Sequence, residues 1–96
     1  EKPAAPRRAP RSEIAPLQAE ATRCEARVAK LEEMRATIDE RLANPLLYSR
    51  GDTETIETLQ RKRAEVEQGL ARAEALWLKA LEQVEAATGR AAGGAA

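Results

Sequence analysis

The sequence predicts an all-α protein, a two-helix antiparallel coiled-coil hairpin preceded by a disordered basic linker. Of its 96 residues 33% are charged and only 2% are aromatic, so its apolar side chains are mostly Ala and Leu, which favour helices. Apolar residues recur at alternating steps of three and four in two separate stretches, the pattern of a coiled-coil seam. A short segment with a proline and a glycine divides the two stretches, which indicates a turn.

The first segment, residues 1–12, is expected to be a solvated linker. It holds three of the five prolines and four basic residues against a single acidic one, Glu1. Prolines and unpaired positive charge oppose packing into a core. We therefore expect this segment to be disordered.

The first helix is expected over residues 15–43. Its apolar stripe consists of Leu17, Ala21, Cys24, Val28, Leu31, Ile38 and Leu42, with Arg35 in the one missing position. Pro16 suits the first turn of a helix, where its missing N–H costs little. Asn44 precedes Pro45 and therefore disfavours the α conformation, which ends the helix.

The turn is expected over residues 44–51 and the second helix over 52–88. Asp52 is a good N-cap for this helix, and Gly89 is expected to end it in the left-handed conformation, leaving a disordered tail over 89–96. Its stripe consists of Ile56, Leu59, Val66, Leu70, Ala73, Trp77, Ala80, Val84 and Ala87. Arg63 occupies the slot between Leu59 and Val66.

Folding the chain about the turn pairs residues whose numbers sum to 97 or 98. Leu31 then meets Val66, and Trp77 meets the small Ala21, as interdigitating layers require. The arm is roughly 45 Å long at about 1.5 Å per helical residue. We expect a monomeric hairpin, since Pro45 and Gly51 argue against the alternative, a coil of two chains.

The composition argues against an enzyme. With no His and a single Cys, the chain lacks the side chains for a zinc cluster, an internal disulfide or a catalytic triad. We expect no cofactor in this segment and no catalysis, with Cys24 an inert core residue. No apolar run approaches the roughly 20 residues that span a bilayer, and a reducing, cytoplasmic compartment is expected.

Four side chains on or near the seam have two interpretations each. Arg35 and Arg63 face each other in one layer, where they either reach water and pair with Asp39 and Glu67, or form a loosened layer or an anion site. Trp77 is expected in the core rather than stacked on a base. Tyr48 in the turn either caps the end of the coil or stacks on a nucleobase.

Two further sets of residues are candidate contact sites. The second helix is apolar over more than one seam near its end, so either the linker folds back onto this surface through Ile14 or the base docks on the parent protein. We expect docking, through a surface formed by Leu76, Trp77, Leu78 and Leu81. Basic residues gather in the linker and around the tip, where they would neutralise phosphates. These are Arg7, Arg8, Arg11, Arg41, Arg50, Arg61, Lys62 and Arg63.

The turn and the end of the second helix also carry a family resemblance. The run Leu42-Ala43-Asn44-Pro45-Leu46-Leu47-Tyr48 and the later Ala73-Glu74-Ala75-Leu76-Trp77-Leu78 resemble the C-terminal coiled-coil domain of bacterial ABC-F ATPases of the Uup-like type. Asn44 replaces the usual Asp, and Thr53 stands where a Pro often follows the capping Asp. The resemblance covers about residues 11–87.

The resemblance implies an accessory arm behind two ATP-binding cassettes, without transmembrane domains. ATP and magnesium would then belong to the cassettes. It further implies weak nucleic-acid binding, to DNA or to ribosomal RNA, without sequence specificity. The alternative is a structural arm whose base docks on the ATPase body and positions or restrains it.

Overall fold

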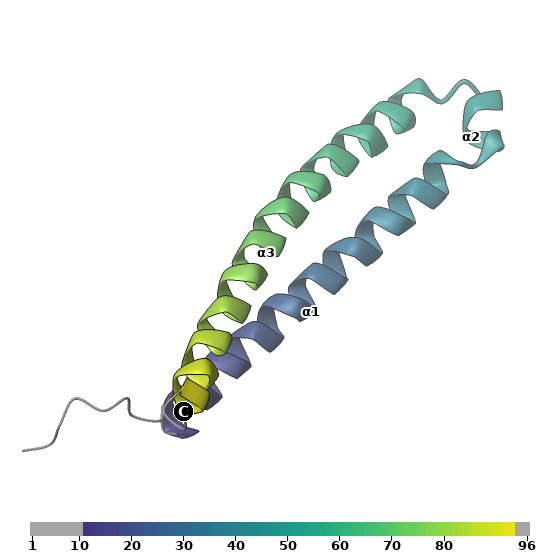
Figure 1. Cartoon of the computed structure of the whole chain (residues 1–96). Helices are drawn as coiled ribbons and strands as arrows, with labels where there is room; N and C mark the ends of the chain where they lie inside the picture. Colours follow the sequence, from purple (N-terminus) through teal and green to yellow (C-terminus); the bar gives the residue numbers. More distant parts are fainter. Residues whose placement is uncertain (1–10, 94–96) are drawn as a thin grey trace, which may run out of the picture.

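The computed structural model describes residues 11–93, with side chains described through residue 89. It contains α1 (Arg11–Leu42), the short α2 (Pro45–Ser49) and α3 (Thr53–Gly93), and no strand occurs within this range. Figure 1 shows α1 and α3 running side by side in opposite directions, with α2 at the end where the chain turns. The predicted all-α hairpin is confirmed, and the expected linker lies outside the described residues except for Arg11 and Ser12, which are helical.

Helix α1 begins one turn before the predicted Ala15 and ends at Leu42, beside the predicted Ala43. Pro16 consequently lies in the second helical turn rather than the first. The hydrogen bond that Pro16 removes would have reached the carbonyl of Ser12, at the frayed start of the helix. The proline ring therefore removes a backbone hydrogen bond only near the N-terminal end of the helix, and α1 continues past Pro16.

The turn contains a helix of its own that the sequence pattern did not predict. Asn44 is its N-cap and accepts a hydrogen bond from the backbone N–H of Leu46 at 3.0 Å, with Pro45 in the first helical position. Gly51 then reverses the chain with φ +68°, the left-handed region that favours glycine. Asp52 caps α3 as predicted, accepting from the N–H of Thr55 at 3.2 Å.

Helix α3 is longer than expected, because it continues past Thr88 to Gly93. Gly89 therefore does not end the helix, and among the described glycines only Gly51 has a positive φ. Two alanines precede Thr88 and two follow Arg90, so Gly89 lies within an alanine-rich stretch. Alanine is the strongest helix former. The preference of these alanines outweighs the cost of about 1 kcal/mol for a glycine in a helix. With 41 residues, α3 is about 60 Å long rather than 45 Å.

The core consists of two apolar clusters between α1 and α3. The cluster nearer the base contains Val28, Leu70 and Ala73, with Leu31 and Trp77 packed against it. The cluster nearer the tip contains Ile38, Leu59 and Val66, with Leu31, Leu42 and Leu47 packed against it. These groupings agree with the predicted layers, and Trp77 belongs to the core as expected. Through Leu47, α2 closes the tip end of the second cluster.

Two glycine-to-alanine substitutions are expected to change stability in opposite directions. At Gly69, an added Cβ would lie 3.9 Å from Cδ2 of Leu31, an ordinary contact. Gly69→Ala should therefore raise the free energy of unfolding by about 0.5–1 kcal/mol. Gly51→Ala should lower it by roughly 1–2 kcal/mol, because an L residue is strained at this φ. Urea denaturation of both variants measures this, and a shift of the same sign in both would contradict it.

Candidate nucleic-acid interface

The two arginines that interrupt the apolar stripes are paired across the hairpin. Nη1 of Arg35 lies 3.5 Å from Oε1 of Glu67, and Nε of Arg63 donates to Oδ1 of Asp39. Arg63 also lies 3.2 Å from Glu67 through its Nη1 atom. The side chains of Arg35 and Arg63 are 34% and 40% exposed, so both reach water over their methylene stems. The expected partners are confirmed, but two of the three ion pairs cross from one helix to the other.

The ion pairs among Arg35, Asp39, Arg63 and Glu67 shift the pKa values of Asp39 and Arg63. The hydrogen bond from Arg63 holds the pKa of Asp39 below its ordinary value of 3.8. The same hydrogen bond raises the pKa of Arg63. The guanidinium of Arg63 is thereby held by two carboxylates. Of the predicted phosphate contacts that lie within residues 11–89, Arg63 is the one in an intramolecular ion-pair cluster.

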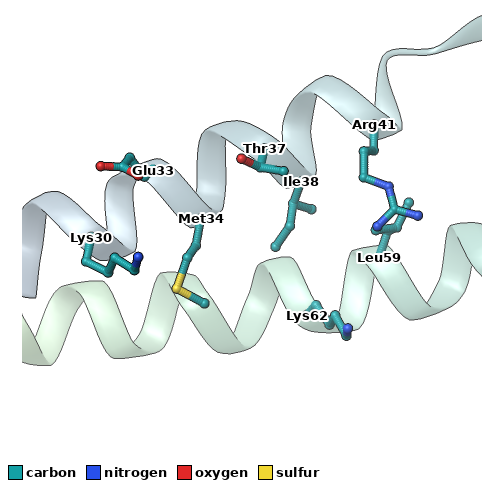
Figure 2. A pocket seen from close by; sticks show the side chains of 8 residues that line it. All are labelled: Lys30, Glu33, Met34, Thr37, Ile38, Arg41, Leu59 and Lys62. Carbon is teal, nitrogen blue, oxygen red and sulfur yellow. The ribbon is translucent and has the colours of Figure 1, made fainter.

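Two other predicted contacts, Arg41 and Lys62, lie together on one side of the tip half. They line a surface groove of about 380 Å³ between α1 and α3. Figure 2 shows side chains from both helices along it. Ile38 and Leu59 form its apolar floor together with Met34, which is 44% exposed. The remaining lining residues are Lys30, Glu33 and Thr37.

Two smaller hollows continue this groove toward the turn. Arg41 and Leu59 line both of them as well as the groove itself. One hollow adds Arg50 beside Leu46 and Leu47, and the other adds Glu54 with two threonines, Thr55 and Thr58. The three depressions thus form one continuous side of the tip half. We name it the groove side.

The groove side carries more positive than negative charge. Its cations are Lys30, Arg41, Arg50 and Lys62, and its acidic residues are Glu33 and Glu54. Among the side chains described through residue 89, none of these four cations has a carboxylate oxygen within 4 Å. Their charges are therefore available to an anion in solution.

The other predicted cations are not gathered there. Arg61 is exposed, but it lies about 100° around α3 from Lys62. Arg11 is exposed at the first residue of α1, at the opposite end of the arm. Arg7 and Arg8 lie outside the described residues. The structure thus brings together three of the eight predicted contacts, Arg41, Arg50 and Lys62.

The sequence interpretation missed Lys30 and Met34 on the groove side. Lys30, Met34, Thr37 and Arg41 follow one another at steps of four, three and four, which places them on one face of α1 beside the seam. The same spacing was assigned only to the apolar stripe. A search for the stripes that flank the seam would have found these residues.

Tyr48 acts as a cap in the folded chain. Its hydroxyl donates to the backbone carbonyl of Leu42 at 2.6 Å, which satisfies an otherwise unpaired acceptor at the end of α1. The side chain remains 51% exposed. The capping interpretation explains its position, because α2 holds the ring against the end of α1.

The predicted docking residues at the base do not form a single patch. Leu76, Leu78 and Leu81 are 57%, 58% and 43% exposed, whereas Trp77 is half-buried against the core. Leu78 and Leu81 are three residues apart and share one side of α3. Leu76 precedes Leu78 by about 200° of helical rotation and therefore lies on the other side, in line with the groove.

Cys24 is half-buried, and its Sγ lies 3.6 Å from Oε2 of Glu20. Burial raises the pKa of the thiol, with the neighbouring Glu20 adding to the effect. The thiol therefore stays protonated near neutral pH, and this lowers its reactivity. The residues that the structure describes include no cluster of side chains suited to holding a metal ion, and no helix among them is long and apolar enough to cross a bilayer.

The crossed ion pairs predict a pH dependence of stability. Because the pKa of Asp39 is lower in the folded chain than its ordinary 3.8, the pair stabilises the fold fully above about pH 5 and loses this effect as the pH falls below about 4. Asp39→Asn should therefore be less stable than the wild type at pH 7, and the difference should shrink by pH 2. Urea denaturation across this range measures it. Glu40→Gln, at an exposed neighbouring position, is the control; an Asp39→Asn deficit that persists at pH 2 would contradict the assignment.

Comparison with known proteins identifies the family of the chain. The family model of the ABC transporter C-terminal domain matches residues 15–83, which include most of α1, all of α2 and most of α3. No curated protein and no solved structure matches the chain. The match confirms the resemblance to the terminal domain of ABC-F-like proteins, while the narrower Uup-like assignment stays a prediction. Because it covers more than half of the sequence, the chain belongs to the family of ABC transporter C-terminal domains.

Proposed function

We propose that this accessory domain of an ABC protein binds nucleic acid, DNA or ribosomal RNA, through phosphate contacts and without sequence specificity. Its role is to add a contact to the parent protein rather than to catalyse a reaction. The supporting observation is the groove side, where Lys30, Arg41, Arg50 and Lys62 gather from two helices and the turn. Phosphate contacts of this kind bind and orient without reading the bases.

The remaining predicted cations contribute to different degrees. Arg11 begins α1 and adds positive charge at the base, and Arg7 and Arg8 lie outside the described residues. Arg61 is exposed away from the groove, and Arg63 is engaged by Asp39 and Glu67. We therefore expect the groove side to contribute more to affinity than Arg61 or Arg63.

Removing two cations from the groove side should weaken binding in a salt-dependent way. For the whole chain and a DNA duplex, the groove-side contacts alone should make log affinity fall with log salt at a slope of about −3 to −5. The variant R41Q/K62Q should reduce this slope by about 2, because each lost phosphate contact removes about 0.9. Fluorescence anisotropy with labelled duplex DNA and a ribosomal RNA hairpin measures both quantities and identifies the preferred polymer.

The single variant R61Q is the matched control at the same height on α3. It should alter the slope by less than half a unit, since Arg61 points away from the groove. An equal loss per charge in both variants would contradict the groove side as the contact. Absence of binding by the wild type at low salt would overturn the proposal.

The exposed leucines at the base support a second candidate function, a structural arm that docks on the ATP-binding cassettes. Leu78 and Leu81 expose about half of their surface on one side of α3. Neighbouring apolar side chains at such exposure are typical of a surface that is covered in an assembly. In this alternative the arm positions or restrains the ATPase body.

Cysteine labelling distinguishes this second candidate. In a Cys24→Ala background, L78C should react with maleimide at similar rates to R61C in the isolated chain, because both positions are exposed. When the chain is joined to the cassettes, L78C should be protected at least tenfold while R61C at the tip remains reactive. Equal rates for L78C with and without the cassettes would exclude docking through this side.

A further inference from the structure

The charges of the hairpin are sorted around its long axis rather than along it. Starting from Lys30 and Lys62, which line the groove, steps of three, four and seven residues lead to further cations on the same side of each helix. All of them are exposed. This cationic flank consists of Arg23, Arg27, Lys30, Arg41, Lys62 and Arg72, and Lys79 extends it toward the base.

The opposite flank is acidic. Asp39 and Glu67 mark it, since they form the crossed ion pairs on the side away from the groove. Heptad steps from these two residues again stay on one side. The acidic flank consists of Glu25, Glu32, Asp39, Glu67 and Glu74.

Some charges reduce the contrast between the flanks without reversing it. On the cationic flank, Arg23 forms an ion pair with Glu20, and Glu65 lies three residues beyond Lys62. On the acidic flank, Arg35 and Arg63 neutralise part of the charge of Asp39 and Glu67. A neutral chain with 16 residues of each sign thus presents opposite charges on two sides.

The cationic flank is long enough to match several steps of a rigid polyanion. Arg23 and Arg41 are 18 residues apart on α1, which corresponds to about 27 Å at about 1.5 Å per residue. Lys62 and Lys79 span about 25 Å on α3. Eight steps of a double helix cover a similar length at about 3.4 Å each. Charges fixed on two helices suit phosphates that are themselves held at fixed positions.

The flank offers no aromatic side chain on which the bases of a single strand would stack. The chain has one Trp and one Tyr. Trp77 packs against the core cluster of Val28, Leu70 and Ala73, and the hydroxyl of Tyr48 is bonded to the end of α1. Proteins that bind single strands commonly combine a basic groove with such stacking. Phosphate contact alone favours a double helix.

We propose that a nucleic-acid double helix lies lengthwise along the cationic flank, from the groove side to the base, with the acidic flank facing away. This inference rests on the proposed function and specifies its ligand. The contact extends over the arm instead of being confined to its tip. It assigns contacts to Arg27, Arg72 and Lys79, which the sequence pattern had not indicated.

The test compares triple substitutions at similar heights on the two flanks. The variant R27Q/R72Q/K79Q removes three cations outside the groove, and E25Q/E32Q/E74Q removes three charges from the acidic flank. Anisotropy titrations use the whole chain with a 20-base-pair DNA duplex, an RNA duplex of the same length, and the single strands. The first variant should lower the salt slope for the DNA duplex by about 2.7, at about 0.9 for each lost contact. The second should leave the slope unchanged, and both should fold, which circular dichroism checks.

The outcomes separate this inference from the function on which it rests. Weaker binding by R41Q/K62Q with unchanged binding by R27Q/R72Q/K79Q would keep nucleic-acid binding at the tip and overturn the lengthwise arrangement. Single strands bound as tightly as the duplexes would overturn the double helix as ligand. A preference between the two duplexes identifies the polymer within the proposal. No binding of the wild type to any probe at low salt would overturn both proposals.

Discussion

The crossed pairing of Arg35 with Glu67 and of Arg63 with Asp39 is the constraint on which the register of the hairpin depends. Apolar layers that repeat every seven residues fit one another almost as well after a shift of one heptad. Such a shift would set Arg35 against Leu70 and Arg63 against Leu42. Each arginine would then face an apolar layer and lose its partner on the other helix, while Arg63 would keep Glu67 on its own helix. The charged layer therefore favours one alignment among several that the leucines alone would accept.

The same layer determines what the two sides of the hairpin present to solvent. Its guanidinium groups lean toward Asp39 and Glu67 and leave the other side to Met34, Arg41 and Lys62. One side is thus occupied by internal ion pairs, and the other offers unpaired cations above an apolar floor. The chain has no net charge, but the spacing of its charged residues along the helices places cations on one side of the hairpin and carboxylates on the other.

The turn keeps the two long helices at a fixed separation at the tip. Asn44 caps α2, Tyr48 bonds to the end of α1, and Leu47 packs against the core. The end of α1 is thereby satisfied without a long loop, and Arg50 is held beside Arg41. The turn thus closes the tip of the hairpin with contacts to both the end of α1 and the core.

The two helices, their antiparallel pairing and the layers of the core follow from the amino-acid pattern, because steps of three and four and a Pro–Gly turn admit few other folds. The sequence also indicated Asp39 and Glu67 as partners of the facing arginines, and Trp77 as a core residue. The folded chain was needed to show which helix supplies each partner. The fold separated Arg63 from Arg41 and Lys62, although Lys62 and Arg63 are adjacent in the sequence. It likewise divided Leu76 from Leu78. Neighbours in sequence point in directions about 100° apart on a helix, so adjacent residues often belong to different surfaces. Each surface of the hairpin instead combines residues from both helices, and the packing of the two helices fixes which residues these are.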